Sequence, residues 1–260
     1  MNITNNLKIL FLKSTHMNLD FLEIHQRTLI LLGKENFERI RNSHVAVFGL
    51  GGVGGYALEA IARAGVGTIT IVDYDKIEPS NINRQLLSST ETLGKLKVDV
   101  AEKRILSVNP IAKIFKHPLF INKETIPIIT NPLPQYAIDA IDSVGPKVEL
   151  LSYLYQKNIF TVSCMGAGFK VNPLAIRCED ISKTHTCPLA KVVRSELKKV
   201  GIHKGILCVF SVEPPIKQET PLEKEETSKS KNIGSISYTP GIIGLVSAGI
   251  VLQKIIENAK

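Results

Sequence analysis

A glycine-rich segment with the spacing G-x-G-x-x-G follows a short apolar run and precedes a stretch with helical spacing. Its glycines are Gly49, Gly51, Gly52 and Gly54. Such glycines let the backbone approach a phosphate, and the helix N-terminus offers free N–H groups and a positive dipole. Asp73 ends the next predicted strand, where a carboxylate would accept hydrogen bonds from ribose hydroxyls. The combination favours nucleotide binding over a merely tight turn, and it suits NAD and ATP equally.

Three charged residues further along the chain favour ATP. Arg84 and Lys97 supply cations, which a departing pyrophosphate needs because charge builds up on its oxygens. Asp142 follows the fourth predicted strand, at the carboxyl edge of the sheet where ligands bind. A carboxylate there can hold Mg²⁺ bound to the phosphates. A dehydrogenase needs none of these three groups, so the set predicts ATP and Mg²⁺ as cofactors.

The elements that would position these residues alternate between strand and helix. The predicted strands are 45–48, 68–72, 112–115, 136–141 and 160–164, and the predicted helices are 53–64, 95–108 and 146–157. This alternation predicts an α/β fold with a Rossmann-like, mostly parallel sheet and helices on both faces. The second half is predicted to be a mixed α+β extension, with strand and turn at 170–181, a helix at 187–200, a strand at 207–212 and a closing helix at 241–258.

We expect three parts along the chain. Residues 1–16 form an N-terminal extension, 17–165 the ATP-binding core, and 166–260 a part that completes the same globule. A segment at about 213–233, with three prolines and a mixed Lys/Glu run, predicts a mobile surface loop. The closing helix is most simply core or dimer packing.

Composition bounds the partners. The 260 residues contain 32 Lys plus Arg against 24 Asp plus Glu, a net charge of +8, which favours a polyanionic partner such as nucleic acid. No apolar stretch reaches about 18 uninterrupted residues, so we expect no membrane span and a cytoplasmic location. The cysteines form no Cys-x-x-Cys pair, so no zinc is expected.

The same residues resemble the ThiF/MoeB-like superfamily, which includes the ubiquitin-activating enzymes. The resemblance covers about residues 24 to 165. The segments that carry it are Arg27-Thr28, the Gly49–Gly54 loop, Ala64-Gly65-Val66-Gly67, Asp73-Tyr74-Asp75, Asn81-Ile82-Asn83-Arg84-Gln85, Gly94-Lys95-Leu96-Lys97, Val108-Asn109-Pro110 and Asp139-Ala140-Ile141-Asp142. Members of this superfamily adenylate a carboxylate with Mg·ATP.

The resemblance implies roles for individual residues. Residues implied to bind the nucleotide are the four glycines, Asp73, Asp75, Asn81, Asn83, Arg84, Lys97, Asp142 and Ser143. Lys97 is implied to stabilise the transition state, and Asp142 to hold the metal, while Asp75 either binds ATP or caps the turn before Pro79. Arg27 stands where the family has an arginine that reaches into the partner's ATP site, which implies a homodimer. The implied catalytic set is thus Arg27, Arg84, Lys97 and Asp142.

The second half resembles one branch, the tRNA threonylcarbamoyladenosine dehydratases. The matching segments are Asp180-Ile181-Ser182-Lys183, Cys187-Pro188-Leu189-Ala190-Lys191, Val209-Phe210-Ser211-Val212-Glu213 and Gly234-Ser235-Ile236-Ser237-Tyr238. Those enzymes use ATP to close the threonylcarbamoyl side chain of the adenosine next to the anticodon into a ring. The implied partners are tRNA and, beside it, a candidate sulfur-relay protein.

A basic segment is the candidate tRNA contact. Residues 170–204 hold eight Lys or Arg against three acidic residues. Its candidates are Lys170, Lys183, Lys191, Arg194, Lys198 and Lys199, and the alternative is a solvated helix face.

Other functions stay open on the sequence alone. They are activation of a ubiquitin-like protein's C-terminus, NAD-dependent oxidation, and a non-catalytic nucleotide-binding adaptor. Cys187, at a predicted helix start, is either a nucleophile that forms a thioester or simply a small residue, and we favour the second reading. Cys164 is most simply a buried small hydrophobe.

Overall fold

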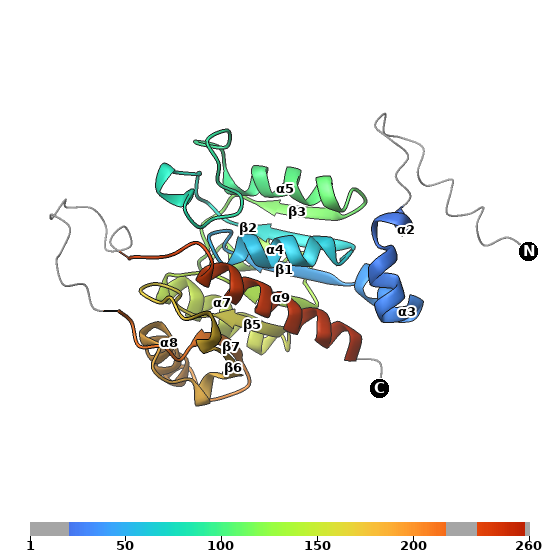
Figure 1. The fold of residues 1–260 in the computed structure, drawn as a ribbon. Helices are drawn as coiled ribbons and strands as arrows, with labels where there is room; N and C mark the ends of the chain where they lie inside the picture. Colours follow the sequence, from blue (N-terminus) through green and yellow to red (C-terminus); the bar gives the residue numbers. More distant parts are fainter. Residues whose placement is uncertain (1–20, 217–232, 258–260) are drawn as a thin grey trace, which may run out of the picture.

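The computed structural model describes residues 21–216 and 233–257. The expected extension at 1–16 and most of the expected loop at 213–233 lie outside these residues. The remaining chain contains a seven-stranded sheet in the order β3-β2-β1-β4-β5-β7-β6 (Figure 1). Its strands are β1 (His44–Phe48), β2 (Thr68–Val72), β3 (Lys113–His117), β4 (Tyr136–Asp139), β5 (Phe160–Cys164), β6 (Ile176–Asp180) and β7 (Leu207–Ser211).

Six of these strands run parallel, and only β6, at one edge, is antiparallel to its neighbour β7. The predicted Rossmann-like, mostly parallel sheet with a mixed second half is confirmed. Strand β7 comes from the second half of the chain and pairs directly with β5. The sheet is therefore continuous across residue 165.

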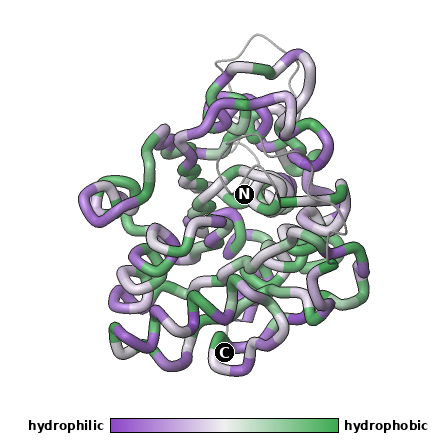
Figure 2. Tube along the Cα trace, turned by 90° about the vertical axis from the view of Figure 1, so that its left-hand side faces the viewer, coloured by the Kyte–Doolittle hydropathy of each residue, from purple (hydrophilic) through white to green (hydrophobic). Residues whose placement is uncertain are grey.

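Helices cover both faces of the sheet. They are α2 (Phe21–Ile24), α3 (Gln26–Arg41), α4 (Gly54–Arg63), α5 (Lys97–Val108), α6 (Ile126–Ile129), α7 (Val144–Gln156), α8 (Pro188–Lys199) and α9 (Thr239–Glu257). Side chains of α4, α5 and α9 share one core cluster, and those of α6 and α7 share another on the opposite face. Helix α8 packs beside α7 against β7. Along the trace, hydrophilic and hydrophobic segments alternate, and many outer turns are hydrophilic (Figure 2).

Strand β1 shows why these runs are apolar at successive positions. Val45 and Val47 point into the cluster shared with α4 and α9, while Ala46 and Phe48 point into the cluster shared with α7. All four side chains are fully buried. A strand with helices on both faces cannot alternate apolar with polar residues, so β1 reads as a continuous hydrophobic run.

Strand order fixes where a ligand can sit. The chain moves outward from β1 through β2 to β3, and then returns to place β4 on the other side of β1. The connections that follow β1 and β4 leave toward opposite sides, so a crevice opens between the carboxyl ends of these two strands. Ligands bind in this crevice in sheets of this kind. The glycine loop after β1, Asp73 after β2 and Asp142 after β4 all lie at this carboxyl edge.

Helix α9 closes the core. It is a described helix whose length and composition would suit a membrane span, but half of that span is buried within the protein. Ile243, Ala248 and Val251 are fully buried in the cluster with α4. In this structure α9 therefore serves as a core helix.

The sequence analysis did not predict helix α3. Ile30 and Leu31 lie on it with about four-fifths of their surface exposed, which obscures the periodicity of an amphipathic helix. Gly33 interrupts the helix with a φ of 76°.

Two glycines on α9 give a matched test of this packing. A Cβ on Gly244 would overlap the carbonyl oxygen of Val53, whereas a Cβ on the exposed Gly249 would meet nothing within 4 Å. We expect Gly244→Ala to destabilise the fold by about 1–3 kcal/mol because α9 must move away from α4. Gly249→Ala should stabilise it by about 0.5–1 kcal/mol, since alanine favours the helix. Urea unfolding of both variants measures the change in the free energy of unfolding. A Gly244→Ala protein as stable as wild type would contradict this packing.

Candidate active site

Two of the loop glycines are required by the fold itself. Gly49 has a φ of +85°, and a Cβ there would lie 2.8 Å from the carbonyl oxygen of Ala140. A Cβ on Gly54 would overlap the carbonyl oxygen of Gly49. The loop therefore folds tightly on itself and against the turn after β4.

Gly51 is different, because packing does not explain it. A Cβ there would meet only the Gln85 amide nitrogen, at 3.9 Å, so the space beside Gly51 is open. Helix α4 begins at Gly54, the last glycine of the loop, and no side chain caps it. Open backbone at an uncapped helix N-terminus is suited to a phosphate group, which accepts hydrogen bonds from free N–H groups.

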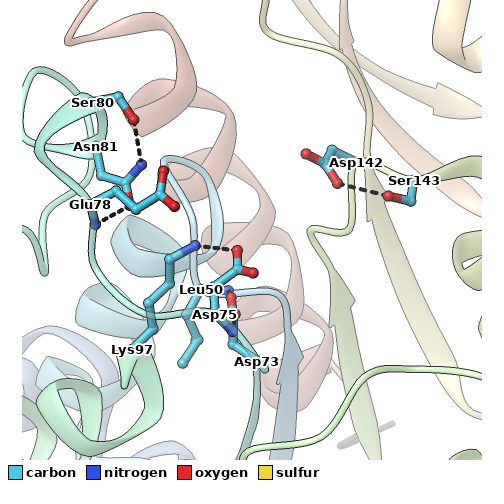
Figure 3. Close-up of polar contacts among 9 residues, drawn as sticks. All are labelled: Leu50, Asp73, Asp75, Glu78, Ser80, Asn81, Lys97, Asp142 and Ser143. Carbon is cyan, nitrogen blue, oxygen red and sulfur yellow. Dashed lines mark hydrogen bonds and ion pairs between the residues drawn. The ribbon is translucent and has the colours of Figure 1, made fainter. Parts of the chain in front are cut away.

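Asp73 ties the end of β2 to the glycine loop. Its Oδ2 accepts a hydrogen bond from the Leu50 N–H at 2.6 Å, and its Oδ1 accepts one from the Asp75 N–H at 2.8 Å (Figure 3). Burial raises the pKa of this carboxyl, and the nearby Lys97 ammonium opposes the shift. The side chain thus has a structural role in the loop in addition to the ribose contact expected from the sequence.

Lys97 is a buried cation at the first position of α5. Only 5% of the residue is exposed, and its Nζ lies 2.7 Å from Oδ2 of Asp75 (Figure 3). The Lys97 N–H also donates to the Asp75 carbonyl at 3.0 Å. These contacts hold the ammonium group toward the carboxyl edge of the sheet, beside Asp73.

The segment after β2 presents the other expected residues. Asn81 is buried and fixes a short turn, because its Oδ1 accepts from the Glu78 N–H at 3.1 Å. The half-buried Arg84 donates from Nη1 to the Ser80 carbonyl and to Oδ1 of Asn83, at 2.8 and 2.9 Å. Asn83 in turn donates to the Ser235 carbonyl at 3.2 Å. This segment is therefore linked to the chain that leads into α9.

Asp142 and Ser143 lie across from this group. Both are exposed, and the Ser143 hydroxyl donates to Oδ1 of Asp142 at 3.2 Å (Figure 3). Burial raises the pKa of the nearby Tyr74, and the charges of Asp75, Asp142 and Asp73 raise it further. Within the described residues no group of three or more His, Cys, Asp or Glu could hold a metal. A divalent ion here would need phosphate oxygens beside Asp142 to complete its ligands.

Below Asp142 lies a buried polar network whose lysine, Lys147, the sequence analysis did not predict. Asp139 and Lys147 form an ion pair, Oδ2 to Nζ, at 2.7 Å, and both side chains are fully buried. The Ser163 hydroxyl donates to the same Oδ2 at 2.6 Å. One feature of the sequence could have indicated this network. Lys147 lies four residues before Leu151 in the predicted helix, and this spacing puts the lysine on the apolar side that faces the sheet.

Arg27 lies far from the site of its own chain. His25, two residues earlier, packs beside Gly65. A Cβ on Gly65 would lie 3.3 Å from the His25 ring. Gly65 follows the C-terminal end of α4, whereas the glycine loop precedes its N-terminal end (Figure 1). Arg27 is exposed at this opposite, amino-terminal edge of the sheet.

The basic segment divides into two groups. Lys183, Lys191, Lys198 and Lys199 are exposed, while Arg194 is partly buried and donates to the Thr184 carbonyl. Lys170 was wrongly included among the candidate tRNA contacts. It is only 2% exposed, and its Nζ donates to the Ser211 carbonyl at 2.9 Å. Its ammonium group points inward, because a turn at 168–169 precedes it and directs it to the carbonyl at the end of β7.

The cysteines are dispersed. Cys178 is exposed, whereas Cys164, Cys187 and Cys208 are buried. Cys187 stands at the N-cap of α8 and is 2% exposed. Burial raises the pKa of the Cys164 thiol to about 12, and its sulfur lies 3.1 Å from the Ser247 hydroxyl. A thiol with so high a pKa is a poor nucleophile at neutral pH.

Comparisons with known proteins place the chain among its relatives. A family model described as the ThiF family matches residues 25–260. The tRNA threonylcarbamoyladenosine dehydratase of Bacillus subtilis is 38% identical over 244 residues, which cover 90% of this chain and 96% of the relative. A crystal structure of the E. coli tRNA N6-threonylcarbamoyladenosine dehydratase in complex with ATP has a TM-score of 0.84 at 31% identity and covers 92% of this chain and 96% of that one.

Similarity to another branch is shorter. The sulfur carrier protein adenylyltransferase of Thermus thermophilus is 36% identical over 124 residues, which cover 47% of this chain and 45% of that one. The family model, in contrast, spans both the glycine loop and the second half. The chain belongs to the ThiF family.

Proposed function

We propose that the protein uses ATP to dehydrate threonylcarbamoyladenosine in tRNA, closing its side chain into a ring next to the anticodon. The observation that carries this proposal is the extent of the similarity to dehydratases, which runs through both halves of the chain. The site agrees with it, because an open glycine loop, a buried lysine and an exposed aspartate meet at one edge of the sheet. A tRNA substrate also suits the net charge of +8 and a cytoplasmic location.

The chemistry proceeds in two steps. An oxygen of the threonyl carboxylate attacks the α-phosphorus of ATP, and pyrophosphate leaves. The carbamoyl group of the same side chain then attacks the acyl carbon, loses its proton to solvent, and displaces AMP together with the former carboxylate oxygen. The net change in the nucleoside is loss of one water. Because nucleophile and acyl group belong to one side chain, proximity supplies much of the rate of the second step.

The chain's own residues have separate roles in the first step. The backbone around Gly51 and the start of α4 would bind the phosphates, with Asn81, Asn83 and Arg84 beside them. Lys97 would neutralise the charge that develops at the α-phosphate, and its pairing with Asp75 keeps the ammonium in place beforehand. Mg²⁺ bound to the phosphates would screen their charge, with Asp142 as its protein ligand and Ser143 beside it.

A second candidate function is adenylation of the C-terminus of a ubiquitin-like sulfur carrier. The half-length similarity to a sulfur carrier protein adenylyltransferase favours it, and the same first step would serve. A sulfur-relay protein then remains a candidate partner. The full-length similarity to dehydratases favours the tRNA substrate.

A nucleoside mass assay with two neighbouring lysine variants tests the proposal. Incubated with Mg·ATP and tRNA that bears the open threonylcarbamoyl group, the protein should convert this nucleoside to a product lighter by one water. Lys97→Ala should lower the rate at least about 100-fold, because it removes a cation from the transition state. Lys95→Ala is the matched control, since the ammonium group of this exposed lysine donates to the Glu91 carbonyl and not to a site residue among the described residues, and the variant should retain the activity.

An unchanged nucleoside, with wild-type protein that binds ATP, would contradict the tRNA substrate. ATP-dependent adenylation of a ubiquitin-like protein in its place would establish the second candidate.

A homodimer is part of the proposal, since Arg27 lies at the edge of the sheet opposite its own site. If it completes the partner's site, Arg27→Ala and Lys97→Ala homodimers are both impaired. Random mixing of the two should restore about a quarter of wild-type activity, because half of the dimers are mixed and each has one intact site. Activity of the mixture is measured after unfolding and refolding together. No recovery, with mixed dimers demonstrated by tagged subunits, would exclude a shared site.

The exposed lysines of the basic segment are the proposed tRNA contact. Replacing Lys183, Lys191 and Lys198 by alanine should lower the slope of log affinity against log salt by about two, since each phosphate contact releases a counterion. The control replaces Lys103, Lys113 and Lys157, which are also exposed and give the same net charge. Gel shifts over a salt series measure both slopes. Equal slopes for the two triple variants would place the tRNA elsewhere.

A further inference from the structure

The buried pair of Asp139 and Lys147 holds a short turn. Lys147 Nζ donates to the Ile141 carbonyl at 2.9 Å and to the Cys164 carbonyl at 2.8 Å. Asp139 Oδ1 accepts from the Ile141 N–H at 3.1 Å. Both backbone groups of Ile141, the residue directly before Asp142, are therefore fixed by this pair. The second carbonyl that Lys147 contacts belongs to the end of β5, so the turn is also tied to the neighbouring strand.

The same turn supports the glycine loop from its other side. The Ala140 N–H donates to the Phe48 carbonyl at 2.8 Å. A Cβ on Gly49 would contact the Ala140 carbonyl, and a Cβ on Gly54 would contact the Ala140 Cβ. A displacement of residues 140–142 would therefore change the space beside the loop as well as the position of Asp142.

Stability alone is a weak reason for two fully buried charges here. Removing them from water is costly, and apolar residues of similar size often replace such a pair without loss of stability. Leu150 and Leu154, which follow Lys147 on the buried side of α7, are apolar, so this side of the helix suits an apolar residue. What an apolar residue cannot do is donate to two carbonyl groups at once.

We propose that Lys147 is a positioning residue for the adenylation site. Through Asp139 and the Ile141 backbone it fixes the turn that presents Asp142 to Mg·ATP and that supports the glycine loop. This inference rests on the proposed function for its ligand, although the turn it describes can be measured without one.

The test uses the charge-free double variant Asp139→Asn, Lys147→Met, because Lys147→Met alone would leave a buried carboxylate without its cation. The control is Leu154→Ala, two turns further along α7 and also fully buried, which loosens the same helix without touching either carbonyl. Hydrogen exchange of the peptide that covers residues 139–145 is measured without ligand. ATP affinity is then measured with and without Mg²⁺, in the wild type and in both variants.

In the double variant we expect this peptide to exchange faster. Mg²⁺ should increase ATP affinity in the wild type, and in the double variant this increase should be smaller by about 10-fold or more, as for other residues that orient a metal ligand. Adding Asp142→Asn should then cost little more, since both changes remove the same contribution. Leu154→Ala should leave both readouts near wild type.

Unchanged exchange and an unchanged Mg²⁺ effect in the folded double variant would overturn the inference. So would an equal loss in Leu154→Ala, or full additivity with Asp142→Asn. Failure of the wild type to bind ATP would reject the proposed function instead, and the exchange result would still decide whether the pair fixes the turn.

Discussion

The close approach of the glycine loop to the turn after β4 is the constraint on which the site depends. Strands β1 and β4 are parallel neighbours whose connections leave in opposite directions, so their carboxyl ends open a crevice. There the backbones of Gly49 and Ala140 lie so close together that a Cβ on Gly49 would be 2.8 Å from the Ala140 carbonyl oxygen. This contact allows residues separated by about ninety positions in the chain to face one ligand. Strand β2 adds Asp73, which is bonded back to the same loop.

Charge in this crevice is arranged in layers. Asp73, Asp75 and Asp142 give the edge a negative character that would repel a nucleotide on its own. Lys97 and Arg84 offset it from the side of α5 and of the segment after β2, and a divalent ion beside Asp142 would do so from the side of β4. Below them, the pair of Asp139 and Lys147 fixes the turn without adding net charge to the site.

Much of the fold follows from local patterns in the sequence. Strands β2 and β5 have the predicted bounds, because apolar, β-branched runs between turns leave little choice. Individual side chains were harder. Lys170 is basic like its neighbours, and only tertiary packing shows that it points inward to the Ser211 carbonyl. Lys147 was missed because its partners, Asp139 and two carbonyl groups, come together only when α7 packs on the sheet. The motif residues at the strand ends could be identified since glycine spacing and strand register fix their place.

The central claim is that this site activates a carboxylate by adenylation, and the fate of one oxygen tests it most directly. The tRNA nucleoside is labelled with oxygen-18 in the threonyl carboxylate, and the products of one round with Mg·ATP are analysed by mass spectrometry. The account predicts one labelled oxygen in AMP and none in pyrophosphate, because AMP leaves with the oxygen that attacked the α-phosphorus. Formation of ADP with the label in inorganic phosphate would contradict it, since activation would then occur at the γ-phosphate.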